Sequence, residues 1–204
     1  MSRFESDKAF TDYVHTNIAL SKIYGPIGWK QVNFNDSYGI HIDKSDGIDY
    51  VFLKEDQLIT VQERFREIRY KTYTDFTIRY RRDHHKEEAH HESEFYKLKA
   101  QYFVYGIVNG EKKDLSSNND LIKYAVIDLK VFYEKIDKGD IRITDQTLKH
   151  SRISEDGIIE CPVITNRDRS SSFIPIDVVQ LIDLFQDEVV ISQQGFIWVS
   201  VWEF

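Results

Sequence analysis

A polar turn between two β-rich runs constrains the fold of this chain more than any other feature of the sequence. Residues 48–53 (IDYVFL) and 58–66 (LITVQERFR) are rich in β-branched and aromatic side chains, and the turn 54–57 (KEDQ) separates them. This pattern predicts two antiparallel strands joined as a hairpin. Because side chains alternate along a strand, the second strand has two faces. One face carries Gln62, Arg64 and Arg66, and the other carries Val61, Glu63 and Phe65.

The first 108 residues extend this hairpin into a mixed pattern of helices and strands. Apolar residues at spacings of three and four predict a helix over residues 5–23. A third strand is predicted over 74–80, a helix over 87–100 and a fourth strand over 102–108. The order helix, hairpin, strand, helix, strand predicts the α/β (α+β) class, with a central mixed β-sheet flanked by helices.

The last third of the sequence carries weaker signals of the same kind. They predict a strand at 124–129, helices at 130–138 and 176–185, scattered strands over 141–163, and a closing hairpin formed by 189–191 and 196–202. Pro175 and Asp177 suit the start of the later helix. We expect one domain over residues 1–204, with a core at 1–130 and a C-terminal extension, 131–204, packed on it.

Composition excludes several classes of protein. With 204 residues, 41% of them hydrophobic, the chain can bury a substantial core, which excludes wholesale disorder. No apolar run reaches the ~18 residues needed to span a membrane, and the first seven residues have no apolar signal core. Cys161 is the only cysteine, so no internal disulfide or cysteine-based zinc site can form. We therefore expect a cytoplasmic protein with no membrane partner.

Charge is distributed unevenly along the chain. The net charge of −7 argues mildly against non-specific coating of nucleic acid. Residues 64–82, however, hold seven basic residues against Glu67 and Asp75, a local net charge of +5. A strip of this kind can face phosphates or can be the solvated face of a sheet. The basic residues are Arg64, Arg66, Arg69, Lys71, Arg79, Arg81 and Arg82.

The predicted hairpin can place an acidic residue beside a polar and a basic one. Metal-dependent hydrolysis of a phosphodiester needs carboxylates for the cation and a basic group for the developing charge. Asp49 opens the first strand, and Gln62 lies 13 residues later on the second, a gap that suits paired strands and a short turn. Gln62 and Arg64 are two residues apart and so share a face.

In these residues the chain resembles the restriction-endonuclease-like (PD-(D/E)XK) nuclease superfamily. That signature is proline–aspartate, a spacer, then Asp/Glu, any residue and Lys. The resemblance implies that Asp49 is the metal-binding aspartate, that Gln62 stands at the Asp/Glu position and that Arg64 stands at the lysine position. The chain departs from the signature at Ile48, where the family has proline, at the amide Gln62 and at Arg64. As an order of elements the likeness covers roughly residues 1–130.

The resemblance also implies roles for further residues. Glu63 is a second candidate metal ligand, although it belongs to the opposite face of its strand unless a bulge turns it. A basic residue from the helix over 87–100 can serve such a site, and Lys97, three residues after Glu94, is the candidate. Arg64 and Lys97 would then stabilise the charge that develops on phosphate, and three arginines would contact other phosphates. These are Arg66, Arg79 and Arg81.

The function implied is a Mg²⁺-dependent (or Mn²⁺-dependent) endonuclease that hydrolyses DNA, plausible as a homodimer because two strands need two sites. The alternative is an inactive, phage-related nuclease fold that binds nucleic acid or protein, and the degenerate motif supports it. A third interpretation is a regulatory protein whose basic strip binds an acidic protein. The histidines at 84, 85, 90 and 91 could hold zinc, but a solvated link before a helix is favoured.

Overall fold

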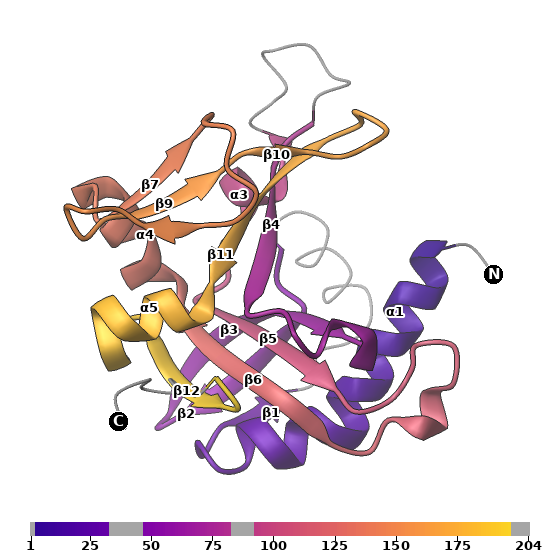
Figure 1. Ribbon diagram of the computed structural model, residues 1–204. Helices are drawn as coiled ribbons and strands as arrows, with labels where there is room; N and C mark the ends of the chain where they lie inside the picture. The colour runs from indigo at the N-terminus through magenta and orange to yellow at the C-terminus, as the bar shows by residue number, and fades with distance from the viewer. Residues whose placement is uncertain (1–2, 33–46, 83–91, 197–204) are drawn as a thin grey trace, which may run out of the picture.

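A six-stranded mixed β-sheet runs through the middle of the molecule in the computed structural model (Figure 1), which describes residues 3–32, 47–82 and 92–196. The class predicted from the sequence, a mixed sheet with flanking helices, is confirmed. The strands follow the order β1-β2-β3-β5-β6-β12 across the sheet. Their bounds are β1 Lys30–Val32, β2 Tyr50–Lys54, β3 Gln57–Arg66, β5 Tyr102–Val108, β6 Leu121–Asp128 and β12 Val190–Gln194.

The remaining elements cover this sheet and build two small sheets beside it. Among the described residues, no helix combines the length and the apolar character needed to cross a bilayer. The helical segments are α1 Arg3–Val14, the π-helical η1 His15–Tyr24, η2 Ile68–Tyr70, α3 Glu94–Lys97, η4 Leu115–Ser117, α4 Leu129–Lys138, α5 Val178–Phe185 and η5 Gln186–Glu188. The small sheets have the orders β10-β11-β4 and β7-β9-β8. Their strands are β4 Asp75–Arg81, β7 Ile141–Thr144, β8 Arg152–Ile153, β9 Ile159–Pro162, β10 Ile164–Thr165 and β11 Ser172–Asp177.

Strand β3 is the pivot of the topology. It pairs antiparallel with β2, as the predicted hairpin requires, and parallel with β5 on its other side. The connection between β3 and β5 leaves the large sheet to form β4 and α3 and then returns. The order helix, hairpin, strand, helix, strand predicted for the first 108 residues is therefore the observed order.

Each face of the six-stranded sheet is covered by a hydrophobic core, because side chains alternate along its strands. Phe103 and Tyr105 of β5 face a core shared with β4, β11, α4 and α5. Val104 and Val108, on the other face, join a second core under α1 and η1. Fully burying a side chain of this size contributes ~1.5–3 kcal/mol. The sheet is thus buried on both sides at its centre.

The segment after residue 130 pairs with the earlier part of the chain. β11 lies antiparallel to β4, and β12 lies antiparallel to β6. Residues of α5, including Leu181, belong to the same core as Phe103. The predicted extension therefore contributes β12 to the six-stranded sheet and β11 to the small sheet that contains β4.

Two predicted helices differ from those observed. The helix expected over 87–100 is the short α3, Glu94–Lys97, within the described residues. The helix expected from residue 176 begins at Val178, and Pro175 lies in β11. Among the described strands, β4 alone pairs with β11 at Pro175, and proline is tolerated in a strand with one open edge. Asp177 caps α5 by accepting from the backbone N–H groups of Val179 and Gln180, so the helix starts after it.

Several sequence predictions fall outside the described residues. They are the first part of the helix predicted over 87–100, the histidine group at 84–91 and the second half of the closing hairpin after residue 196. The first half of that hairpin is found in β12, which pairs with β6. The end of the chain toward residue 196 therefore extends the central sheet at its edge.

Gly106 of β5 provides a test of the packing between the sheet and α1. A Cβ built there would lie 2.9 Å from Phe65 Cδ1 and 3.2 Å from Leu121 Cδ2. We expect Gly106→Ala to lower the free energy of unfolding in urea by about 1–3 kcal/mol, the usual cost of overpacking. Gly106→Val should cost more. An unchanged midpoint for both variants would contradict the close approach of Phe65.

Candidate functional site

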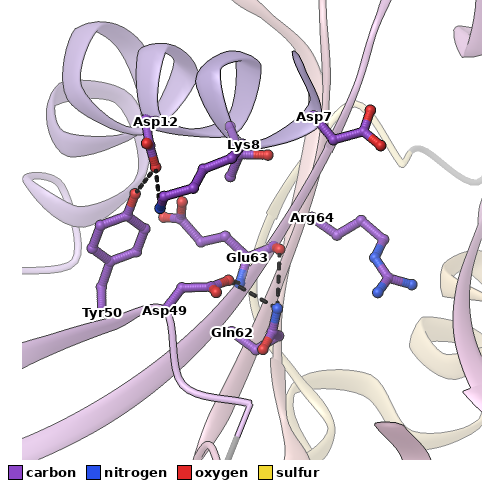
Figure 2. Close-up of a pocket in the computed structure, with 9 residues that line it drawn as sticks. Asp7, Lys8, Asp12, Asp49, Tyr50, Gln62, Glu63 and Arg64 are labelled. Atoms are coloured by element: carbon purple, nitrogen blue, oxygen red, sulfur yellow. Dashed lines mark hydrogen bonds and ion pairs between the residues drawn. The ribbon is translucent and has the colours of Figure 1, made fainter. Parts of the chain in front are cut away.

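The carboxylate of Asp49 is held at the start of β2 by groups on β3 (Figure 2). Asp49 Oδ2 accepts a hydrogen bond from Gln62 Nε2 at 2.9 Å and another from the backbone N–H of Glu63 at 2.7 Å. The backbone N–H of Asp49 donates to the carbonyl of Val61. The structure thus brings Asp49 and Gln62 together across the hairpin, as their 13-residue spacing predicted.

The three consecutive residues of the candidate motif point to different sides of β3. Burial alternates along the strand: Val61, Glu63 and Phe65 are buried, and Gln62, Arg64 and Arg66 are partly exposed. This confirms the predicted division into two faces. Glu63 does not turn outward through a bulge, because its pairing with β5 is regular. Its carboxylate lies under η1, on the face opposite Gln62 and Arg64.

The Glu63 carboxylate is engaged with two residues of η1. Its Oε1 lies 2.9 Å from His15 Nδ1 and accepts a hydrogen bond from Tyr24 OH at 2.5 Å. The side chains of His15 and Glu63 are 3% and 0% exposed. Burial, followed by the charge of Glu63, raises the pKa of Tyr24 well above its ordinary value, so this hydroxyl stays a donor.

A stacked ring links this buried group to the surface. The imidazole of His15 lies 3.4 Å from the ring of Tyr50, measured between centroids, with the planes 4° apart. Tyr50 OH donates to Asp12 Oδ1 of α1 at 3.2 Å, and burial together with the charges of Glu63 and Asp12 raises the pKa of Tyr50. Asp12 also pairs with Lys8, and both lie beside Asp49 in the same pocket.

Arg64 is held on the other face of β3 by the segment that connects β3 to β5. Its Nη2 lies 2.5 Å from Glu94 Oε1, and its Nη1 donates to the carbonyl of Thr77. Burial lowers the pKa of Arg64, but the adjacent Glu94 carboxylate outweighs that effect, so the pKa lies above its ordinary value. The guanidinium therefore stays charged. It also lies 5.7 Å from the ring centroid of Phe103.

Two adjoining pockets meet at Arg64. The first, of about 390 Å³, is mainly acidic and is lined by Asp7, Lys8, Thr11, Asp12, Asp49, Tyr50, Gln62, Glu63 and Arg64. The second, of about 520 Å³, holds four basic side chains, Arg64, Arg66, Arg69 and Lys112. Two of them are paired with acidic residues of the same pocket, Arg69 with Glu67 and Lys112 with Asp7, so Arg64 and Arg66 supply its excess positive charge. The pockets share Asp7, Thr11, Glu63 and Arg64. An acidic hollow that opens beside a basic one suits a phosphate group accompanied by a cation.

The other predicted phosphate contacts are placed apart from Asp49. Arg66 donates to Thr77 Oγ1 and lies over the rings of Tyr70 and Tyr105. Arg79 is exposed, and its backbone N–H donates to Glu94 Oε2. Arg81 lies 3.5 Å from Asp145. Of these three, Arg66 alone lines the basic pocket beside Arg64.

Lys97 does not join the residues around Asp49. It is exposed at the end of α3, and neither pocket that Arg64 lines includes it. Its predicted neighbour Glu94 is bound instead to Arg64 and to the backbone of Arg79. Among the basic candidates, Arg64 is the one that shares a pocket with Asp49.

The candidate site offers few side chains that could bind Mg²⁺. Within the described ranges, no three His, Cys, Asp or Glu residues are grouped to hold a metal ion. Glu63 Oε1 is bound to His15 and Tyr24, which leaves Asp49 as the carboxylate on the face of Gln62 and Arg64. Mg²⁺ commonly uses one or two carboxylates, with waters and substrate phosphates as its other ligands. Asp49 fits that pattern, and the amide of Gln62, whose Nε2 donates to Asp49, would have to turn for its oxygen to join as a second ligand.

Sequence reasoning gave no role to three residues that shape the site: His15, Tyr24 and Asp12. His15 and Tyr24 lie on a helical segment far from β3 in the sequence. A histidine on the apolar stripe of the predicted helix was the one signal that could have identified this contact, since a polar group there needs a buried partner.

Comparisons with known proteins add no relative. A scan against protein-family models found no match for this chain, and searches of curated proteins and of solved structures found none either. The likeness to the restriction-endonuclease-like superfamily therefore rests on Asp49, on the spacing of Gln62 and Arg64, and on the order of elements.

Tyr24→Phe tests the buried support beneath the site. The substitution removes one hydrogen-bond donor from a buried carboxylate, so we expect the free energy of unfolding to fall by about 1–3 kcal/mol. Tyr73→Phe is the matched control, because Tyr73 is exposed and a surface change of this kind stays within about 0.5 kcal/mol. Urea unfolding followed by tryptophan fluorescence measures both. Equal stabilities of the two variants would contradict the Tyr24–Glu63 contact.

Proposed function

We propose that this protein is a Mg²⁺-dependent (or Mn²⁺-dependent) phosphodiesterase that cleaves DNA, with Asp49 at the centre of its active site. The observation that carries the proposal is the junction of the acidic and basic pockets at Arg64. A phosphate placed there meets the Arg64 guanidinium on one side and the oriented Asp49 carboxylate on the other. The order of elements supports the proposal, since it is the order that the family resemblance implies.

The residues of the chain divide the work between them. Asp49 is oriented by Gln62 Nε2 and by the Glu63 N–H, which hold its carboxylate in the acidic pocket. Arg64 is fixed by Glu94 and Thr77, yet 30% of its side chain remains exposed, so it can contact a phosphate oxygen and offset developing negative charge. Arg66 extends the positive charge along β3.

Asp49 and Gln62 would hold the metal ion. The chemistry that Mg²⁺ supplies is Lewis-acid activation of a phosphoryl oxygen. Glu63 serves this site through its backbone N–H, while its carboxylate is bound to His15 and Tyr24. Lys97, exposed on α3, would act on a more distant part of the substrate.

A second candidate is a nuclease-like fold that binds DNA without cutting it. Two observations favour it: the described residues contain no group of three metal-ligating side chains, and an amide stands at position 62. Under either function we place the protein in the cytoplasm, where the buried thiol of Cys161 would stay reduced. A homodimer would supply two sites for cutting two strands.

Asp49→Asn tests the proposed active site. Asparagine keeps an oxygen that can accept from the Glu63 N–H but removes the charge, so the fold should survive while metal-dependent cleavage falls by about 100-fold or more. Plasmid cleavage with Mg²⁺ or Mn²⁺ measures the rate, and EDTA should abolish it. Asp56→Asn is the matched control, because Asp56 lies in the turn of the same hairpin at a φ of 66° that asparagine accepts.

Three results would decide between the candidates. Cleavage that Asp49→Asn loses and Asp56→Asn keeps supports the proposed active site. Cleavage retained by Asp49→Asn, with its circular dichroism unchanged, refutes the role of Asp49. DNA binding by the wild type with no cutting of single-stranded or double-stranded substrates would favour the inactive binding module.

A further inference from the structure

A third hollow lies at the far end of β4, where the C-terminal part of the chain comes back to the first part. It has a volume of about 660 Å³ and is lined by Asp7, Arg79, Asn166, Arg167, Asp168, Ser170 and Ser171. Asp7 of α1 also lines both pockets at Arg64. The three hollows therefore adjoin one another along the start of α1, and the turn between β10 and β11 borders the outermost one.

The turn between β10 and β11 is held by its own backbone and polar side chains. The Asn166 N–H donates to the carbonyl of Ser171 at 2.8 Å, and the Arg169 N–H donates to the carbonyl of Asn166 at 2.8 Å. Asn166 Nδ2 donates to Ser171 Oγ at 2.7 Å. Arg169 takes a left-handed backbone conformation, with φ at 57°. Arg167 and Arg169 are thus presented from a defined turn, and both are exposed.

Strand pairing brings this turn to two arginines that lie about 90 residues earlier in the chain. In the register of β11 against β4, Ser172 lies opposite Arg81 and Phe173 lies opposite Arg79. Figure 1 shows β10 and β11 extending outward beside the outer end of β4. One end of the three-stranded sheet therefore carries four arginines in its strand and turn, and two of them, Arg79 and Arg167, line the third hollow. The four are Arg79, Arg81, Arg167 and Arg169.

Among the residues that the structure describes, the acidic groups near these arginines offset only part of their charge. Asp145 lies 3.5 Å from Arg81. Asp168 Oδ1 accepts from the backbone N–H and the hydroxyl of Ser170, and Asp7 is paired with Lys112. The chain as a whole carries a charge of −7, so a local excess of arginine stands out against it. Guanidinium groups match the geometry of phosphate, and serine and asparagine side chains commonly donate to it as well.

We propose that the turn 166–171 together with the outer end of β4 forms a DNA-binding arm, which holds the sugar–phosphate backbone outside the cleavage pocket. This inference rests on the proposed function, because the arm serves the same substrate as the pocket at Asp49. In this proposal the C-terminal region binds the DNA backbone through Arg167 and Arg169. Contacts of this type carry little sequence information, so the arm adds affinity rather than base selectivity.

The arm is tested by the salt dependence of DNA binding. Fluorescence anisotropy of a labelled 30-base-pair duplex, titrated in EDTA at 50–200 mM NaCl, measures binding without cleavage. Each phosphate contact contributes about 0.9 to the slope of log K against log salt concentration, so Arg167→Gln/Arg169→Gln should lower the slope by about 2. The matched control is Arg142→Gln/Lys149→Gln, which removes the same charge from exposed residues of the same region outside the three hollows.

The outcomes separate the arm from the proposed active site. A lower slope for the arm variant and a wild-type slope for the control would support the arm. Equal slopes for wild type and arm variant would overturn the arm and leave the active site standing. Displacement of the DNA by polyglutamate as readily as by unlabelled DNA would also overturn it and indicate an acidic protein partner. Retained cleavage by Asp49→Asn would overturn the active site alone, and absence of DNA binding by the wild type in EDTA would overturn the arm alone.

Discussion

The buried carboxylate of Glu63 is the constraint on which the rest of the site depends. A carboxylate removed from water is costly unless hydrogen bonds replace its hydration. Both partners that supply them, His15 and Tyr24, come from η1. This requirement fixes how the helical segment 3–24 lies on the sheet, because a small shift would leave the carboxylate without donors. Glu63 also orients a residue of the acidic pocket, since its backbone N–H donates to the Asp49 carboxylate.

The arginines of the sequence divide into two groups with different tasks. Arg64 and Arg66, on the inner part of the basic strip, are bound to Glu94 and Thr77 and to aromatic rings, so part of their charge stabilises the fold. Arg79, at the outer end of β4, is exposed to a much greater extent. A basic strip read from the sequence therefore overstates the charge that a ligand meets near Asp49. The excess lies further out, where the turn between β10 and β11 adds Arg167 and Arg169.

Local periodicity accounts for what could be predicted of the fold and site. Alternation along β3 and the spacing between Asp49 and Gln62 depend on residues close in sequence, so the hairpin and its two faces were foreseeable. The contact of Glu63 with His15 joins residues 48 positions apart and leaves no local pattern. At Pro175 a local signal gave a wrong prediction. Proline favours a helix start locally, but pairing with β4 extends the strand to Asp177, a tertiary effect that propensity does not record.

The residues at the Asp/Glu–x–Lys positions of the motif, Gln62 to Arg64, do not all face the candidate site. On β3, positions 62 and 64 share a face with Asp49, and the one carboxylate among residues 62–64, that of Glu63, lies on the other face. The Glu63 carboxylate binds His15 and Tyr24 of η1, and Asp49 is the carboxylate of the motif that lies on the side of Gln62 and Arg64. A cation at Asp49 would then take most of its ligands from water and from substrate phosphate, as Mg²⁺ tolerates. Metal and nucleic acid would bind cooperatively, because the phosphate supplies ligands to the cation and the cation offsets the charge of the phosphate. The basic side chains of the pocket beside Arg64 would strengthen the binding of the nucleic acid.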